Sequence, residues 1–171
     1  LFASFIKRYT NQADVVIGYP VNLRPRGFKD SFGLFVNILP LHIDISGDIS
    51  FNELVKRIDT RRRLDKKNQN LPSLDIIREK RRKAPEFDVQ RFNISMVETI
   101  SRLQNLELDG IKSTALDSDH IETHEDLSFI YEITEGEIML WFEYKAELFS
   151  DAQIADITAH MQKMIAAFAD N

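Results

Sequence analysis

Hydrophobic residues recur along the chain in two spacings, one typical of helices and one typical of strands. Residues 1–10 carry apolar side chains at helical spacing, which predicts a helix that ends near Asn11. Its apolar positions are Leu1, Phe2, Phe5, Ile6 and Tyr9. No Met and no capping residue precede this helix, so we expect the chain to be an excised piece of a longer polypeptide.

Short β-branched and aromatic runs predict strands over residues 14–21, 35–45 and 92–98, with a Pro- and Gly-containing loop at 22–30. The stretch SFGLFVNILPLHIDI (31–45) contains the second of these strands. Gly33, Asn37 and Pro40 interrupt its apolar residues. Because Pro cannot donate to a strand ladder, we expect this strand to lie at a sheet edge or to bulge at Pro40. A glycine at position 33 indicates a close backbone approach.

Asn37 lies between two apolar residues of this run, and a buried amide is costly without hydrogen-bond partners. Two interpretations remain open at this point. The amide is tied to local backbone, or the strand presents it to a ligand.

The clearest pattern lies near the end of the chain. Apolar residues alternate over 127–133 and 138–144 on either side of Glu135-Gly136, which predicts an antiparallel hairpin. Ser-x-x-Glu at Ser50 and Ser-x-x-Gln at Ser150 predict capped helix starts, and Pro72 suits the first turn of another helix. The expected class is α/β, a mixed sheet covered by helices.

Composition narrows the classes of function. The chain has 171 residues, a net charge of -5 and no Cys, which argues against a nucleic-acid surface and excludes disulfides and thiolate sites. No apolar run is long enough to span a membrane, and we expect a cytoplasmic protein. Basic residues are clustered in RPRG (24–27) and REKRRK (78–83). These clusters either form a docking surface for an acidic partner or only keep the protein in solution.

Catalytic and metal-binding patterns are weak. None of the four histidines is followed four residues later by an acidic residue, and no Gly-x-Ser-x-Gly elbow occurs, so we expect no catalytic residue in this chain. His120, Glu122 and His124 would share one face of an extended segment and could hold zinc. A solvated polar loop is the preferred interpretation, and no metal or other directly bound cofactor is expected.

At this point the residues resemble a known family. GLFVNILPLHI resembles the Gly-x-Phe-Val-Asn-Thr-(Leu/Gln)-x-x-Arg signature of nonribosomal peptide synthetase condensation domains, and DVVIGYPVNLRPR is similar to the strand and loop that lead into it. NQNLPSLDIIRE is similar to the family's His-Gln-Asp-x-Pro-Phe-Glu block, and the last hairpin and helix resemble its closing elements. The departures are Ile38 for Thr, His42 for Arg and Ser73 for an aromatic residue.

The resemblance implies a fold and an activity. Condensation domains are pseudo-dimers of two chloramphenicol-acetyltransferase-like halves, and residues 1–171 resemble the C-terminal half. The catalytic His-His-x-x-x-Asp-Gly motif belongs to the N-terminal half. The implied reaction is amide formation between thioesters held on the 4'-phosphopantetheine of peptidyl or aryl carrier domains. This half would supply one wall of the tunnel and be inactive without its partner half.

The resemblance also assigns roles to residues. Asn37, Phe35 and Gly33 would line the substrate tunnel, while Gly18, Pro20 and Arg24 would be structural or lie at the tunnel mouth. A packing role is implied for Asn68, Gln69 and Pro72. Asp126, which opens the last hairpin, would stabilise a turn. Possible carrier-docking residues are Arg26, Arg78, Arg81 and Arg82. Open alternatives are an epimerisation or cyclisation relative, an ester-forming acyltransferase of the same fold, and a non-catalytic carrier-docking module.

Overall fold

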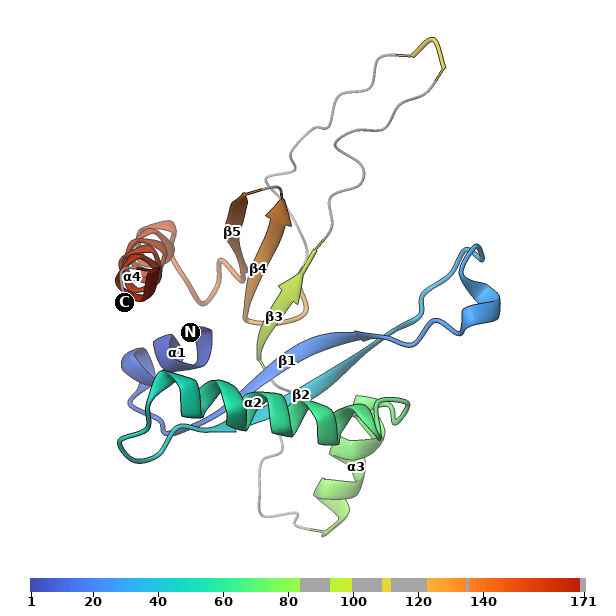
Figure 1. The fold of residues 1–171 in the computed structure, drawn as a ribbon, viewed down its shortest axis with the longest axis horizontal. Coiled ribbons are helices and arrows are strands. Elements are labelled where there is room, and N and C mark those ends of the chain that lie inside the picture. Colours follow the sequence, from blue (N-terminus) through green and yellow to red (C-terminus); the bar gives the residue numbers. More distant parts are fainter. Residues whose placement is uncertain (84–92, 100–108, 112–122, 135, 170–171) are drawn as a thin grey trace.

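The computed structural model describes residues 1–83, 93–99, 109–111, 123–134 and 136–169, which form one mixed sheet with helices packed against it (Figure 1). The elements follow in the order α1 (Phe2–Thr10), β1 (Asp14–Asn22), the 3-10 helix η1 (Arg26–Phe28), β2 (Val36–Asp44), α2 (Phe51–Lys66), α3 (Ser73–Lys83), β3 (Ile94–Glu98), β4 (Leu127–Thr134), β5 (Glu137–Tyr144) and α4 (Asp151–Ala169). The predicted α/β class is confirmed.

The strand order in the sheet is β2-β1-β3-β4-β5. The β1–β2 and β4–β5 pairs are antiparallel hairpins, whereas β3 runs parallel to both of its neighbours. Among the described residues, β1 and β3 pair only through Gly18 and Ser95. Beyond this point the β1–β2 ribbon diverges from the other three strands (Figure 1).

Strand β2 lies at the edge of the sheet and shows no bulge at Pro40. Its register with β1 is continuous from Asp44, opposite Asp14, to Val36, opposite Asn22. Pro40 pairs with Gly18 within this register. The edge-strand alternative is therefore confirmed, and it explains how a residue without an N–H is tolerated in the strand.

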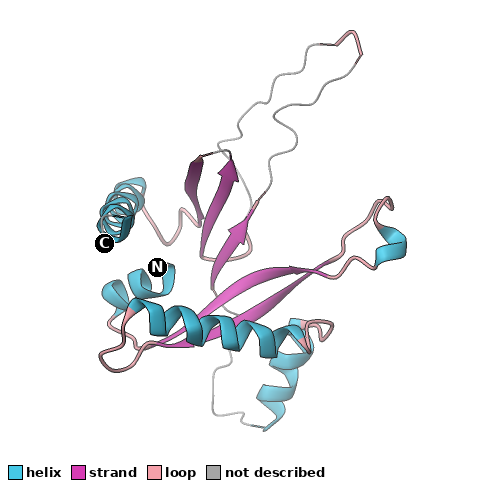
Figure 2. Cartoon of the chain, viewed as in Figure 1, coloured by secondary structure: helices cyan, strands magenta, loops and turns pink. Residues whose placement is uncertain are grey.

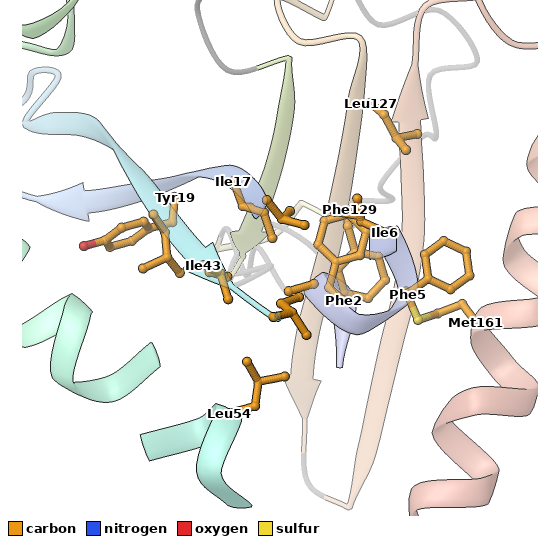
Figure 3. Close-up of a cluster of buried hydrophobic side chains, with 14 of the residues drawn as sticks. Phe2, Phe5, Ile6, Ile17, Tyr19, Ile43, Leu54, Leu127, Phe129 and Met161 are labelled. Atoms are coloured by element: carbon orange, nitrogen blue, oxygen red, sulfur yellow. The ribbon is translucent and has the colours of Figure 1, made fainter. Parts of the chain in front are cut away.

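The hydrophobic core lies on one face of the sheet. Alternate residues of each strand point to this face, and helices α1, α2 and α4 cover it (Figures 2 and 3). The Phe2 ring of α1 stacks on Phe129 of β4 with centroids 4.8 Å apart, while Leu54 of α2 and Met161 of α4 close the cluster from their sides. The strand residues that belong to this core cluster are Val15, Ile17, Tyr19, Leu39, Leu41, Ile43, Leu127 and Phe129.

The predicted helix starts are confirmed. Ser50 Oγ accepts the Glu53 backbone N–H at 3.2 Å. Ser150 Oγ accepts the Gln153 N–H at 3.3 Å, and Gln153 Oε1 accepts the Ser150 N–H at 2.9 Å, which completes a capping box. Pro72 stands directly before α3 rather than inside it, and its carbonyl accepts the Asp75 N–H at 3.0 Å.

The end of the last hairpin departs from the alternation that the sequence shows. Ile133 and Ile138 face each other across β4 and β5, yet both are mostly exposed. They lie next to the turn, beyond the helices that cover the rest of this face.

No described helix has the length and apolar composition that a membrane span requires.

Candidate functional site

The loop that joins β1 to β2 is organised around Arg24. The guanidinium donates from Nη1 to the carbonyl of Phe28 at 3.0 Å and to that of Ser31, and from Nη2 to the carbonyl of Gly33 at 3.3 Å. The Asn22 side chain accepts the Arg24 N–H at 2.8 Å. The five donors of a guanidinium suit this capture of several carbonyls. Arg24 therefore holds the loop closed, which supports its structural role.

The two predicted wall residues nearest to this loop belong to the same clamp. Arg24 Cζ lies 4.2 Å from the centroid of the Phe35 ring, and the Phe28 ring lies 6.2 Å from that of Phe35. Gly33 has a φ of 151°, and a Cβ there would lie 3.3 Å from Cε2 of Phe35. The structure thus brings Gly33, Phe35 and Arg24 together.

The same loop turns apolar side chains toward solvent. Phe32 and Leu34 are almost fully exposed, and Phe28 and Val36 are about half exposed. The loop forms the end of a projecting arm, which continues the β1–β2 ribbon away from the other strands (Figure 1). Large apolar side chains that an ordered loop exposes together are typical of a surface that packs against another protein or domain.

Asn37 is tied to backbone on the helix-covered side of the sheet. By strand alternation it shares a face with Leu39, which is in the core. Its Nδ2 donates to the carbonyl oxygens of Gln69 and Leu71, each at 2.8 Å, and its Oδ1 accepts the Ile38 N–H at 3.0 Å. Only the Ile38 bond is to local backbone, as the first interpretation expects, because the Gln69 and Leu71 carbonyls lie 32 and 34 positions further along the chain. Its place in a tunnel wall stays a prediction.

Gln69 belongs to the second stretch that resembles the family, so two motif-like segments meet at Asn37. The connection between α2 and α3 is further held by the bond from the Leu71 N–H to the Asn68 carbonyl at 3.0 Å. This arrangement supports the packing role expected for this segment.

Gly18 and Pro20 lie where the sheet divides. Gly18 is buried between β2 and β3, with Pro40 and Ser95 as its partners. Pro20 pairs with Ile38 on one side, beyond the last described pair between β1 and β3. Because a proline in a strand interior removes a ladder donor, Pro20 is compatible with this divergence.

The four arginines expected to dock a carrier domain divide into two groups. Arg78, Arg81 and Arg82 lie on α3, whereas Arg26 lies in η1 on the projecting arm, apart from α3 (Figure 1). Arg82 forms a two-pronged ion pair with Glu79, with Nη2 to Oε1 at 2.7 Å and Nε to Oε2 at 2.9 Å. The hydrogen bonds from Arg82, and to a smaller extent the one from Lys83, lower the pKa of Glu79 to about 2.

Two of the described histidines, His42 and His160, contact other polar groups. His42 Nε2 lies 2.7 Å from Asp14 Oδ1 across the β1–β2 pair, and His160 Nδ1 lies 2.5 Å from the Tyr9 hydroxyl. In the part of the chain that the structure describes, no group of three His, Cys, Asp or Glu side chains could hold a metal. His120 and Glu122 lie outside that part. Asp126 forms an ion pair with Lys145 at 2.7 Å, which fits its expected turn role.

Sequence reasoning missed a set of polar groups on the inner strands. Tyr131 donates its hydroxyl to Glu98 Oε2 at 3.3 Å, and Arg62 lies over the Tyr19 ring with Cζ 5.5 Å from its centroid. Burial raises the pKa of both phenols, and the charges of Asp65 near Tyr19 and Glu98 near Tyr131 raise it further.

A second missed feature is a buried hydroxyl pair. Ser95 Oγ donates to Ser128 Oγ at 2.9 Å between the parallel strands β3 and β4. Nothing in the local sequence marks these partners, because their register depends on long-range strand pairing.

Comparison with known proteins assigns the family. The family model for the condensation domain matches residues 1–171, and the chain therefore belongs to the condensation domain family. Its relatives are nonribosomal peptide synthases. A linear gramicidin synthase of Brevibacillus parabrevis is 28% identical over 169 residues, which are 97% of this chain and 2% of that protein. Gramicidin S synthase 2 of Brevibacillus brevis is 27% identical over 174 residues, 97% of this chain and 4% of that protein.

Solved structures agree on the fold. A double mutant of the starter condensation domain of rhizomide synthetase RzmA, solved in complex with C8-CoA, superimposes with a TM-score of 0.79 at 20% identity, and the match covers 99% of this chain and 39% of the solved one. The first condensation domain of the CDA synthetase gives a TM-score of 0.69 at 17% identity, with 92% and 35% covered. The chain thus spans about two-fifths of these solved chains and a few per cent of the curated synthases.

Proposed function

We propose that residues 1–171 are the C-terminal half of a condensation domain that forms amide bonds between carrier-tethered thioesters. The observation that carries the proposal is the match of the whole chain to the condensation family model, together with a fold that covers only 39% of a solved condensation-domain chain. The complementary half would bring the His-His-x-x-x-Asp-Gly motif. None of the four histidines here has an acidic residue in the spacing of that motif.

The proposed reaction joins two tethered substrates. The acceptor amine nitrogen attacks the thioester carbonyl carbon, a C–N bond forms, the C–S bond breaks, and the thiol of the donor phosphopantetheine leaves. The proton lost by the amine passes to a base in the other half, which returns it to the departing sulfur. A mutant of the RzmA starter condensation domain was solved in complex with C8-CoA and Leu-SNAC, which supports this substrate class for the present chain.

The chain would contribute a wall rather than a reacting group. We assign Asn37, Phe35 and Gly33 to that wall because they match the family signature, and Arg24 to a structural role or to the tunnel mouth because it matches the loop that leads into the signature. The contacts of these residues hold them in place. Arg24 binds the Gly33 carbonyl and lies over the Phe35 ring, and Asn37 is bonded to the connection between α2 and α3. Fixed walls align two tethered reactants, which lowers the entropic part of the barrier.

The partner half would pack on the projecting arm. Phe32 and Leu34 are the most exposed large apolar residues described, and they sit on a loop that internal hydrogen bonds already order. Burial of such side chains against a partner is favourable at roughly 25 cal/mol per Å² of apolar surface.

Reconstitution tests the proposal. The chain is assayed with and without the complementary N-terminal half, using acyl and aminoacyl thioesters of N-acetylcysteamine as substrates. We expect amide product only when both halves are present. Amide formation by the chain without its partner, persisting after all four histidines are replaced, would contradict the proposal.

A further inference from the structure

Positive charge is concentrated in one segment of an otherwise acidic chain. Residues 51–83 hold 12 of the 22 Lys and Arg residues but only 5 of the 27 Asp and Glu residues, a net charge of +7. The remaining residues hold 10 basic and 22 acidic side chains, a net charge of -12. Ion pairs inside the segment cannot neutralise it, because cations outnumber anions by seven.

Helix α2 carries part of this charge on its outer side. Lys56, Thr60, Arg63 and Lys67 follow one another at i, i+4, i+7 and i+11, which places them on one stripe along the helix. The opposite side holds Leu54 and Ile58, which pack into the core. The basic stripe therefore faces away from the sheet and toward solvent.

Half-exposed leucines lie beside the stripe where α2 turns into α3. Leu64, Leu71 and Leu74 are each about half exposed, and the eleven residues of α3 include none that is buried. Figures 1 and 2 show α3 below the C-terminal part of α2, on the side away from β3, β4 and β5. A few apolar side chains surrounded by charged ones resemble the core and rim of a transient protein interface.

The connection between α2 and α3, which contains Leu71 and lies between Leu64 and Leu74, is held by a side chain of β2. Asn37 donates to the carbonyls of Gln69 and Leu71, so the connection is anchored to the edge strand. An anchored surface loses less conformational entropy on binding than a mobile one.

We propose that the outer side of α2 and its turn into α3, here called the basic corner (Lys56, Arg63, Leu64, Lys67, Leu71 and Leu74), docks the acidic face of a carrier domain. This inference rests on the proposed function and adds the surface and the charge of the partner. The excess of seven cations favours an anionic partner, and the three leucines favour a protein over a nucleic acid, because phosphate binding uses no apolar centre.

Charge reversal tests the proposal in solution. Binding of a phosphopantetheine-loaded, acidic peptidyl carrier domain to the chain is measured by fluorescence anisotropy at low and high salt. The K56E/R63E/K67E variant should weaken binding about tenfold at low salt and flatten the salt dependence, since charges at an interface rim act mainly on electrostatic attraction. Leu74→Ser should weaken binding at both salt concentrations.

A matched control separates local from global charge. The R8E/K29E/K163E variant makes the same change in net charge at exposed cations outside residues 51–83, and it should bind as the unaltered chain does. Circular dichroism of all variants checks that they fold. Equal weakening by both triple variants, or unchanged binding in K56E/R63E/K67E, would overturn the proposal. Tighter binding of a short DNA duplex than of the carrier domain would overturn it in favour of a nucleic-acid surface.

A second measurement keeps this proposal distinct from the proposed function. In a complete condensation domain, K56E/R63E/K67E should lose turnover with carrier-tethered substrates and keep turnover with free N-acetylcysteamine thioesters, which need no docking. If the unaltered domain turns over neither kind of substrate, the proposed function fails. The binding assay then still decides whether the basic corner is a docking surface.

Discussion

The side-chain amide of Asn37 lies 2.8 Å from the carbonyl oxygen of Gln69, 32 positions further along the chain. Each of these residues belongs to a segment that resembles a separate condensation-domain motif. Their contact ties the edge strand β2 to the connection between α2 and α3. The two segments therefore act as one structural unit.

Replacement of Asn37 should destabilise the fold through this contact. Asn37→Ala removes both donors to the Gln69 and Leu71 carbonyls, and we expect a loss of about 1–3 kcal/mol in the free energy of unfolding. Asn37→Asp should cost more, because it places a carboxylate against two carbonyl oxygens. Urea denaturation measures both, with Asn52→Ala on the exposed side of α2 as control. Full stability in Asn37→Ala together with lost condensation would instead support a role in the tunnel wall alone.

Replacement of Arg24 should open the arm. Arg24→Met keeps most of the side-chain stem but loses the bonds to three carbonyls, so the loop backbone should loosen and a lysine-specific protease should cut more readily after the exposed Lys29. We expect cleavage after Lys29 to accelerate several-fold relative to the unaltered chain. Arg26→Met, two residues away, is the control. Identical cleavage rates in the two variants would show that the clamp does not order the loop.

The exposed apolar tip of the arm should matter only in a complete domain. Phe32→Ser and Leu34→Ser should change the stability of this chain by no more than about 0.5 kcal/mol, because neither side chain is buried. In a complete condensation domain they should weaken association of the two halves, measured by co-purification and by condensation rate. Lys29→Ala in the same loop is the control, and full association of both serine variants would refute this packing.

The buried hydroxyl pair should show strong coupling. Ser95→Ala or Ser128→Ala leaves the other hydroxyl without its partner, at a cost of about 1–3 kcal/mol, whereas the double variant should be close to neutral. A double-mutant cycle in urea measures the coupling energy. Additive effects of the two single replacements would show that the hydrogen bond contributes nothing to stability.

Lowering the pH should destabilise helix α3, because protonation of Glu79 removes its ion pairs with Arg82 and Lys83. The Arg82 and Lys83 side chains lower the pKa of Glu79 from 4.5 to about 2 in the folded chain. A lowered pKa stabilises the folded state above the unfolded value, and the contribution disappears as pH falls from 4.5 toward 2. Glu79→Gln should therefore reduce helix content near pH 6, and this difference should become small near pH 2, as measured by circular dichroism. Because Glu79 is exposed, high salt should shrink the difference at about pH 6. A difference as large at about pH 2 as at about pH 6 would exclude this charge effect.

Much of the secondary structure could be predicted from the sequence because its signals are local. The caps at Ser50 and Ser150 and the alternation around Gly136 each depend on residues within a few positions of one another. The order of strands could not be predicted, since the insertion of β3 between β1 and β4 depends on pairing between distant segments.

The members of the candidate site were proposed from the resemblance, whereas the contacts that hold them could not be predicted. The resemblance singled out Gly33, Phe35 and Asn37, yet neither periodicity nor composition shows that Arg24 holds the first two or that Gln69 holds the third. Such contacts depend on how loops fold back on the sheet. The charge excess of residues 51–83 can be counted from the sequence, but its outward side appears only once Leu54 is placed in the core.

The position of β3 also has a consequence for the order in which the chain folds. The β1–β2 and β4–β5 hairpins each join segments that are close in sequence, whereas β3 bonds in parallel to strands that are remote from it on both sides. Closing such long loops costs entropy before the contacts repay it. We therefore expect the two hairpins to form early and independently, and the pairing of Ser95 with Gly18 and Ser128 to be the slow event that joins them into one sheet.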